Sequence, residues 1–376
     1  MMQKVLFVYF EPQESGQTTH VLSLVRGLRK DKYAITVVLP SQLRKSRSVF
    51  KQTGVTIIPL PMRKILWNSK SIASLFRLIR RENFDIIHVH SQEAGFIVRL
   101  IARVAGAKLI IYTPQCTNIK RTRLFWLYRS IERILSYITD MIISVSEIDR
   151  SRIIQWGIPS SKVITINNGI DIDLKKSLPD IVAKRHMLDL DEKAPIVMQV
   201  GRLSYQKNPL NFLKGASLAI KENPDVQFLL VGDGPLKADV EDYIQELDIN
   251  KNVQCLGWQE NASELIAIAD VITLTSRWEG MPYVLLEAMA WSRPVVATAV
   301  NGCREIVEQE VTGYLVPNND VKSWANSVIK LLADGKKSKD MGQRGNRRLK
   351  DKFSLEKMIE QTEGLYDRLT VNSPND

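Results

Sequence analysis

Short runs of β-branched and other apolar residues alternate along this chain with segments of helical periodicity. In the first half these runs predict strands at Lys4–Tyr9, Ala34–Leu39, Val55–Pro59, Asp85–Val89, Lys108–Tyr112, Met141–Val145 and Val163–Ile166. In the second half they predict strands at Ile196–Val200, Val226–Val231, Val253–Leu256, Val271–Thr275 and Pro294–Ala297. Continuous apolar strands separated by helices are typical of parallel sheets covered on both faces. We therefore expect an α/β fold with two doubly wound domains facing a central cleft.

The division between the two domains is expected at a polar stretch in the middle of the chain. The chain has 376 residues, enough for two domains of ordinary size. The stretch Lys175–Lys184 contains Pro179 and follows a strand-and-turn segment, which predicts domains at residues 1–178 and 179–354. Ligands of doubly wound folds bind beyond the carboxyl ends of the strands, so we expect the site there, in the cleft.

Composition favours a cytoplasmic protein without a membrane-spanning segment. No run of 18 apolar residues occurs, and the apolar N-terminal run is too short for a signal peptide. The three cysteines, Cys116, Cys255 and Cys303, are scattered, which predicts reduced thiols rather than a disulfide framework.

The positive charge lies in the first half of the chain. Residues 1–170 contain 26 Lys and Arg against 10 Asp and Glu, whereas residues 171–376 contain 26 against 31. Such asymmetry predicts that the first half meets an anionic surface, either nucleic acid or an acidic membrane leaflet. Because the sequence has no zinc-finger spacing, RNP-type strand or Gly-x-x-Gly clamp, we expect a membrane surface and no nucleic acid.

Two basic amphipathic helices are predicted in this half. One apolar stripe runs from Ile72 to Ile79, and a second runs from Leu124 to Ile138, each beside several Lys and Arg residues. Most such stripes face the core of the protein. Phe125 and Trp126, at the edge of the second stripe and near arginines, favour docking at a membrane interface for that helix.

Two carboxylates in the second half mark a candidate ligand site. Glu279 lies in a turn-like segment with Gly280 and Pro282, and Glu287 lies on the helix that follows. A helix start attracts anions through its free N–H groups, whereas a carboxylate there suits the hydroxyls of a ligand. The pattern indicates a phosphate-bearing, hydroxyl-rich ligand such as a nucleotide sugar. A solvated helix start and the acid–base pair of a hydrolase are the alternatives.

A basic loop upstream offers partners for a diphosphate. Arg202 and Lys207 follow the strand Ile196–Val200, in a loop that opens a helix near Pro209. Arg supplies a bidentate fork and Lys a point charge. An ordinary basic loop is the alternative, and the acidic motif downstream favours the functional interpretation.

Several other motifs carry weaker signals. Gly232-Asp233-Gly234 lacks the third glycine of a dinucleotide fingerprint and indicates a tight strand-to-helix turn. Gly16 precedes a helix that either receives phosphate or acceptor, or simply begins with a cap from Ser15 or Thr18. The triplets Asp171-Ile172-Asp173 and Asp189-Leu190-Asp191 are more typical of turns than of metal sites.

A pair of histidines ends one predicted strand. His88 and His90 alternate with Val89, so both rings should lie on one face of the sheet. With four histidines in the chain, zinc is not expected. One ring lining the cleft is the favoured interpretation, and a packed strand-end histidine is the alternative.

Taken together, the motifs of the second half resemble those of retaining glycosyltransferases of family 4. The matching set, in family order, is Gly201-Arg202, Lys207-Asn208-Pro209, Gly232-Asp233-Gly234-Pro235, Leu256-Gly257, Glu279-Gly280, Glu287-Ala288-Met289-Ala290, Pro294-Val295-Val296-Ala297 and Gly313-Tyr314-Leu315-Val316. The resemblance is strong over Ile196–Pro317 and thinner in the first half. It implies the GT-B architecture, with a last helix near 355–376 that crosses back to the first domain.

The resemblance also implies roles for particular residues. Arg202 and Lys207 would neutralise the donor diphosphate, Glu279 would contact the donor sugar, and Glu287 would hold the ribose hydroxyls. The residues expected to bind the donor are Gly201, Gly257, Gly280, Met281, Pro282, Tyr283 and Glu287. Those expected on the acceptor side are Gly16, His88, His90 and Gln115. No metal or cofactor is expected, since the nucleotide-diphosphate sugar is a substrate.

The chain departs from the family pattern at Gln115. The family often carries a histidine in this loop, where the chain reads Thr113-Pro114-Gln115. A glutamine forms hydrogen bonds but takes no proton, which puts a histidine-based role at this position in doubt. The usual glycine pair of the first loop is also reduced to Ser15-Gly16.

These observations predict a retaining hexosyltransferase at the cytoplasmic face of the membrane. A UDP-sugar is the favoured donor and GDP-mannose a possible one, with a lipid-linked saccharide of bacterial-type surface polysaccharide biosynthesis as acceptor. The alternatives are a transferase or epimerase of the same fold acting on a soluble small molecule, and a nucleotide- or polysaccharide-binding module without turnover.

Overall fold

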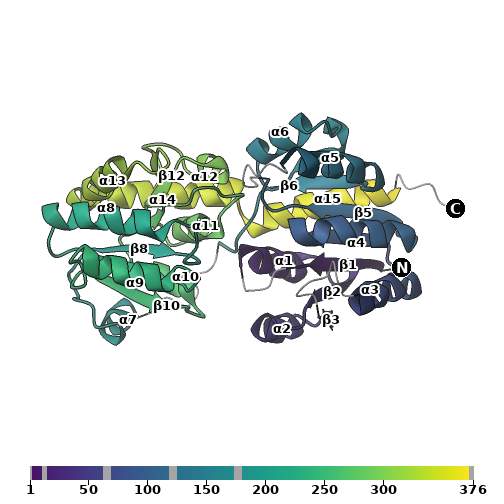
Figure 1. Ribbon diagram of the computed structural model, residues 1–376, viewed down its shortest axis with the longest axis horizontal. Helices are drawn as coiled ribbons and strands as arrows, with labels where there is room; N and C mark the ends of the chain where they lie inside the picture. The colour runs from purple at the N-terminus through teal and green to yellow at the C-terminus, as the bar shows by residue number, and fades with distance from the viewer. Residues whose placement is uncertain (1, 11–14, 62–68, 118–124, 173–179, 372–376) are drawn as a thin grey trace. The chain divides into compact units, whose positions relative to one another are not determined.

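The computed structural model describes residues 2–10, 15–61, 69–117, 125–172 and 180–371. The chain forms two compact units. The first comprises Met1–Gly169 and Leu355–Asp376, and the second comprises Ile170–Ser354 (Figure 1).

The first unit is built on a parallel sheet of seven strands in the order β3-β2-β1-β4-β5-β6-β7. The strands are β1 (Gln3–Tyr9), β2 (Tyr33–Pro40), β3 (Thr56–Leu60), β4 (Ile86–His90), β5 (Leu109–Thr113), β6 (Met141–Ser144) and β7 (Val163–Thr165). Nearly every residue of the central strands β1, β4 and β5 is buried, because helices cover both faces.

Helices of the first unit form a layer on each face of this sheet. They are α1 (Gly16–Gly27), α2 (Arg44–Lys51), α3 (Ser69–Glu82), α4 (Gln92–Val104), α5 (Phe125–Leu135), α6 (Glu147–Gln155) and α15 (Leu355–Val371), with short 3-10 turns η1 (Ser136–Ile138) and η2 (Ser160–Lys162). One core cluster joins the sheet to residues of α3, α4 and α6, and the other joins it to residues of α1, α2 and α15 (Figure 1).

The C-terminal helix α15 is an integral part of the first unit. Its Tyr366 is fully buried and its hydroxyl lies 2.7 Å from Nδ1 of His88 on β4. Its Asp367 forms an ion pair of 2.6 Å with Lys32, next to the start of β2. Helix α1 approaches it so closely that a Cβ on Gly27 would lie 2.4 Å from Ile359. The last helix therefore completes a core that begins at the N-terminus.

The second unit is built on a parallel sheet of six strands in the order β10-β9-β8-β11-β12-β13. The strands are β8 (Ile196–Val200), β9 (Gln227–Val231), β10 (Val253–Gly257), β11 (Val271–Leu274), β12 (Val295–Thr298) and β13 (Gly313–Val316). The helices are α7 (Ile181–Met187), α8 (Pro209–Glu222), α9 (Lys237–Glu246), α10 (Ala262–Ile266), α11 (Tyr283–Ala290), α12 (Asn301–Ile306), α13 (Val321–Ala333) and α14 (Gly335–Lys352).

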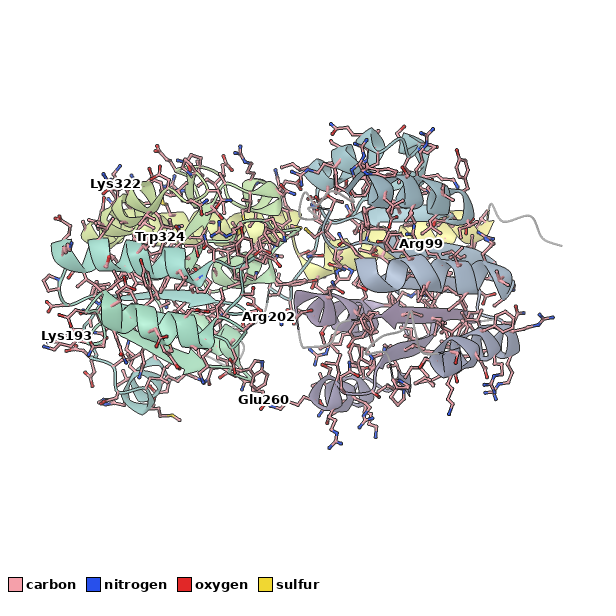
Figure 2. All side chains as sticks on the ribbon, viewed as in Figure 1. Arg99, Lys193, Arg202, Glu260, Lys322 and Trp324 are labelled. Atoms are coloured by element: carbon pink, nitrogen blue, oxygen red, sulfur yellow. The ribbon has the colours of Figure 1, made fainter. Side chains whose placement is uncertain are left out.

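The core of the second unit is centred on a large aromatic side chain. Trp324 of α13 is fully buried and packs edge-on against Phe212 of α8 at 5.6 Å between ring centroids (Figure 2). Gly215 allows this contact, since a Cβ there would lie 2.2 Å from the Trp324 ring. Helices α8 and α13 thereby cover one face of the sheet together.

The predicted fold class, two doubly wound parallel sheets, is confirmed. All the predicted strands occur with small shifts at their ends, and β13 is an additional edge strand, which the sequence indicated only as part of the family resemblance. The boundary between the units lies at Gly169–Ile170, earlier than the expected 178/179. The reason is that the Ile170 N–H donates to the Phe353 carbonyl at 3.1 Å, which ties residue 170 to the end of the second unit.

No helix in the described part of the chain combines the length and apolarity needed to cross a bilayer. Cys116, Cys255 and Cys303 are all free thiols.

The packing of α15 on α1 can be tested with two glycines. We expect Gly27→Ala to lower the free energy of unfolding by about 1–3 kcal/mol, because Ile359 must shift to admit the new methyl group. Gly364→Ala is the matched control: it lies on an open part of α15 and should stabilise the protein by about 0.5–1 kcal/mol. Urea unfolding measures both, and equal effects of the two variants would contradict this packing.

Candidate active site

The loops that follow β8 and β9 are joined by backbone hydrogen bonds, and their glycines allow the two backbones to approach closely. The Gly201 N–H donates to the Val231 carbonyl at 2.9 Å, and the Leu203 N–H donates to the Asp233 carbonyl at 3.0 Å. Gly232 has a φ of 137°, and a Cβ there would lie 2.1 Å from the Gly201 carbonyl oxygen. The Gly-x-Gly motif is thus a tight turn that lets two backbone segments touch.

Lys207 and Glu279 meet at the carboxyl edge of this sheet. Their side chains form an ion pair of 2.6 Å between Nζ and Oε1, although the residues are 72 positions apart in the chain. The pair forms because β8 and β11, the strands that precede the two loops, are neighbours in the sheet. The Glu279 side chain is only 7% exposed and that of Lys207 21%, so the carboxylate depends on this cation for its charge compensation.

A buried polar network supports the backbone beneath this ion pair. The Thr275 hydroxyl lies 2.9 Å from Oε1 of Gln199, and 3.1 and 3.0 Å from the carbonyls of Lys207 and Asn208. Asn208 adopts a left-handed conformation and immediately precedes Pro209, the first residue of α8. Gln199 and Thr275 were not identified from the sequence, where polar residues at the ends of two apolar strands were the only signal.

The turn after Glu279 leads directly into α11, which begins at Tyr283. Gly280, Met281 and Pro282 are buried, and in the described structure no side chain caps the start of this helix. Helix α12 contacts the same turn, because a Cβ on Gly302 would lie 1.7 Å from the Gly280 carbonyl oxygen. Gly302 was also not identified from the sequence, and its close contact fixes the position of the helix start.

Glu287 occupies the second turn of α11 in a desolvated position. Burial raises the pKa of its carboxyl group to about 7. Among the described residues it forms no ion pair, in contrast to Glu279. The two carboxylates therefore differ in their environment: Glu279 is paired with Lys207, whereas Glu287 is desolvated and has a raised pKa. Burial, and next the negative charge of Glu279, raise the pKa of the nearby Cys303 thiol, which stays protonated.

Arg202 is exposed and follows β8 directly (Figure 2). Its side chain takes part in no described hydrogen bond or ion pair. Gly257 ends β10 with a φ of 64°, and its carbonyl accepts from the Gly232 N–H at 2.7 Å. Most of the residues expected to bind a donor follow strands of the second sheet or lie at the start of α11, whereas Glu287 lies in the second turn of that helix. Among them, Lys207 and Glu279 are joined by an ion pair.

The residues expected on the acceptor side lie in the first unit. Helix α1 begins at Gly16, and the Ser15 hydroxyl caps it by accepting from the Gln17 N–H at 3.2 Å. Gln115 has a φ of 66°, and its buried Nε2 has no hydrogen-bond partner among the described residues. Residues 11–14 of the first loop lie outside the described residues.

His88 and His90 lie on one face of the sheet, as the alternation predicts. Their ring centroids are 4.0 Å apart and both side chains are buried. His88 is held on both sides, by Tyr366 at 2.7 Å and by the Thr113 hydroxyl at 2.8 Å, which corresponds to the packed alternative. Both ring nitrogens of His90 are without a hydrogen-bond partner in the described structure.

A third histidine completes this cluster. The His20 ring on α1 lies 5.2 Å from that of His90, and burial lowers the pKa of all three imidazoles. The cluster is therefore uncharged at neutral pH.

Of the two Asp-x-Asp triplets, the structure describes Asp189-Leu190-Asp191 in full. Asp191 accepts from the Lys193 and Ala194 N–H groups, which is a turn interaction, and Asp173 lies outside the described residues. Over the described residues, no group of three or more Asp, Glu, His or Cys side chains is arranged to hold a metal ion.

Comparison with known proteins identifies the family of the chain. Residues 15–174 match the family model described as Glycosyltransferase Family 4, and residues 180–348 match the one described as Glycosyl transferases group 1. The chain is 30% identical to an Escherichia coli UDP-Gal:alpha-D-GlcNAc-diphosphoundecaprenol alpha-1,3-galactosyltransferase, with 98% of each chain covered. It is 25% identical to the Staphylococcus aureus capsular polysaccharide biosynthesis glycosyltransferase CapM, over 94% of this chain and 95% of that one.

Solved structures share the fold. An Anabaena protein, HepE, crystallised with UDP and glucose, superposes with a TM-score of 0.86 at 21% identity, over 97% of this chain and all of the other. A sucrose-phosphate synthase from Thermosynechococcus elongatus superposes with a TM-score of 0.83 at 20% identity, over 99% of this chain and all of the other.

The environment of Glu287 predicts a pH-dependent stability. In the folded protein the carboxyl keeps its proton up to about pH 7, whereas in the unfolded chain it loses it near 4.5. Stability should therefore fall as pH rises between these values, because the folded state binds more protons there. Glu287→Gln removes this dependence. The difference in free energy of unfolding, variant minus parent, should therefore be larger at pH 8 than at pH 5. Chemical unfolding at the two pH values measures this, and a constant difference would contradict it.

The Lys207–Glu279 ion pair predicts an asymmetric effect of substitution. Lys207→Met should destabilise the protein by about 3 kcal/mol, because it leaves the buried Glu279 charge without its partner. The double variant Lys207→Met/Glu279→Gln should recover most of this loss. A double-mutant cycle by urea unfolding measures the coupling, and additive effects would show that the pair is not coupled.

Proposed function

The chain belongs to glycosyltransferase family 4, and we propose that it is a retaining enzyme that transfers a hexose from a UDP-sugar to a lipid-linked saccharide. The observation that carries this proposal is the Lys207–Glu279 ion pair, which places a cation and a carboxylate side by side at the carboxyl edge of the second sheet. A cation suits the donor diphosphate and a carboxylate suits sugar hydroxyls.

The choice of donor and acceptor is supported by the relatives. The E. coli galactosyltransferase is named for UDP-galactose as donor and a GlcNAc-diphosphoundecaprenol as acceptor, and it matches this chain over nearly its whole length. We therefore take UDP-galactose as the first donor to test, with GDP-mannose as the comparison. A diphosphate-linked lipid acceptor also suits the basic first unit.

In this proposal the second unit holds the donor. Lys207 has three N–H donors, so one can remain on Glu279 while the others bind the diphosphate. Arg202 is exposed and unpaired in the described structure, so its fork is available for the same group. The start of α11, where the N-cap residue Pro282 supplies no side-chain hydrogen bond, offers a favourable position for a phosphate. The backbone around Gly201 and Gly257 would meet the nucleoside.

Glu287 has the properties expected of a ribose ligand. It lies on the helix that starts at the phosphate position, and in the described structure no protein cation competes for it. Two ribose hydroxyls donating to its carboxyl would favour the charged form and lower its pKa on donor binding. Glu279, paired with Lys207, would accept from hydroxyls of the transferred sugar.

The chemistry follows from the charge that develops on bond cleavage. Breaking the anomeric bond places positive charge on the sugar ring and negative charge on the departing diphosphate. Fixed cations at that position, Arg202 and Lys207, stabilise the leaving group and supply the main electrostatic contribution. The acceptor hydroxyl attacks from the face that the diphosphate leaves, and its proton passes to a phosphate oxygen. In this scheme the transfer requires no metal ion.

The acceptor would be bound by the first unit, where Gly16, His90 and Gln115 offer polar groups. The unpaired nitrogens of His90 and Nε2 of Gln115 are the strongest candidates for hydroxyl contacts. His88 would act by orienting its neighbour His90, because its own nitrogens are occupied. A lipid-linked acceptor places the enzyme at the cytoplasmic face of the membrane.

Ligand-induced thermal shifts test the donor assignment. We expect UDP-galactose to raise the melting temperature of the protein more than GDP-mannose, an ADP-sugar or a dTDP-sugar at equal concentration, because a ligand that binds only the folded state stabilises it by mass action. A larger shift with a non-uridine nucleotide sugar would overturn the UDP assignment.

Transfer activity tests the residue roles in the same preparations. Arg202→Ala and Glu279→Ala should each lower the transfer rate by about 10²–10³ or more while the protein remains folded, since each removes a group acting on the transition state. Arg344→Ala, an exposed arginine on α14, is the matched control and should retain full activity. Near-normal turnover by either of the first two variants would refute the assignment.

A further inference from the structure

Large apolar side chains are exposed together on one helical layer of the first unit. They come from α4 and α5 (Figure 1) and from η1, and each of these three elements contacts the other two. The members of this set, called here the α4–α5 surface, are Leu100, Val104, Trp126, Leu127, Ile134 and Tyr137. Val104 is 73% exposed, Ile134 65% and Tyr137 74%, so most of these side chains contribute little to the core.

Two arginines of α4 hold the three elements in contact. Arg99 is completely buried and pairs with Glu132 of α5 at 2.8 Å (Figure 2). One turn later, Arg103 donates to the Ile138 carbonyl at the end of η1 at 2.9 Å. Leu100 and Val104 each follow one of these arginines in sequence, so they lie at the end of α4 that contacts α5 and η1. The exposed apolar side chains therefore come from elements that contact one another.

The structure modifies the expectation for α5 itself. Trp126 is exposed, as predicted, whereas Phe125 is half-buried and packs against Trp156. Leu127, predicted to lie in the buried stripe, is 39% exposed. The exposed apolar area thus lies along the outer side of the helix and continues onto α4, which the sequence pattern did not indicate.

The charge around this surface is strongly positive. The first unit contains 28 Lys and Arg against 15 Asp and Glu. Arg99 and Arg103 of α4 are paired with Glu132 and Asp140, whereas Arg129 and Arg133 of α5 form no ion pair among the described residues. Helix α3, which packs on α4, carries further exposed cations at Lys70, Arg77, Arg80 and Arg81. Glu132 is occupied by Arg99, so it does not offset the exposed Arg133 on the same helix.

We propose that the α4–α5 surface docks on an anionic lipid bilayer. Its apolar side chains would enter the boundary between headgroups and acyl chains, while the neighbouring arginines and lysines meet anionic headgroups. Trp126 and Tyr137, each with an apolar ring and a polar group, suit that boundary. A second copy of the chain fits this surface less well, because two equally basic faces would repel each other. The inference rests on the proposed lipid-linked acceptor, which such docking would place within reach.

Vesicle co-sedimentation of the purified full chain tests this proposal. The test variant Leu100→Gln/Val104→Gln/Ile134→Gln removes apolar area without changing charge. Its matched control, Val182→Gln/Met187→Gln, removes exposed apolar residues of α7 in the second unit. We expect the parent and the control to bind vesicles of phosphatidylglycerol and phosphatidylcholine, and the test variant to bind at least tenfold more weakly. All three should bind pure phosphatidylcholine weakly.

Two results would overturn the proposal. One is equal binding of the test variant and the control to the anionic vesicles. The other is concentration-dependent self-association of the parent, in sedimentation velocity, that the test variant abolishes, which would assign the surface to a second copy. Circular dichroism and thermal unfolding confirm that each variant is folded.

A donor measurement separates this inference from the proposed function. The thermal shift of the test variant with UDP-galactose should equal that of the parent, since the substitutions lie in the first unit. Transfer to a detergent-solubilised acceptor should also be retained, while transfer to an acceptor embedded in vesicles falls. If UDP-galactose does not raise the melting temperature of the parent protein, the proposed function is refuted. The vesicle-binding result is independent of that outcome.

Discussion

Parallel pairing of strands that are buried on both faces is the constraint on which the whole molecule depends. Every strand pair in both sheets is parallel, so each strand must be followed by a crossover, and all the loops that follow strands emerge at one edge. Neighbouring strands then bring distant parts of the sequence together. Lys207 and Glu279 meet because β8 and β11 are adjacent, and Gln199 and Thr275 meet beneath them for the same reason. The site is a consequence of strand order.

At the carboxyl edge of the second sheet lie two desolvated carboxylates that the fold itself does not require. Glu279 is nearly buried and has one lysine as its ion-pair partner, and burial raises the pKa of Glu287 to about 7. Both carboxylates lower the stability of the protein in the absence of ligand. This loss of stability is explained if the hydroxyls and phosphates of a bound donor complete the hydrogen bonds of these side chains. The contrast with the buried pair of Arg99 and Glu132 is informative, because Nη2 of Arg99 donates to both carboxylate oxygens and its Nε donates to the Gly95 carbonyl. The hydrogen bonds of the Arg99–Glu132 pair are made within the protein, so this pair has a structural role. The Lys207–Glu279 pair still has donors and acceptors available for a ligand.

Sequence reasoning succeeded where one physical signal dominated. Central strands such as β4 and β8 were predicted because they are continuous apolar runs, and α11 because a turn with Gly280 and Pro282 precedes an apolar helix. It did not identify β13 as a strand, since four residues at a sheet edge carry little periodicity. It positioned Lys207 and Glu279 in the site but not their contact, which depends on strand order. It also did not anticipate the partner of His88, because Tyr366 arrives from the other end of the chain.

The return of the C-terminal helix to the first unit has a consequence for synthesis on the ribosome. The second unit is a continuous segment, Ile170–Ser354, and contains everything it needs to fold once it has emerged. Synthesis of the first unit begins earlier, yet one face of its sheet, which α1 and α2 cover in part, is not completed until α15 has been made after the second unit. The part of the chain that is synthesised first is therefore completed last. Until α15 has been made, the apolar residues of this cluster that it covers in the folded protein remain exposed in the nascent first unit.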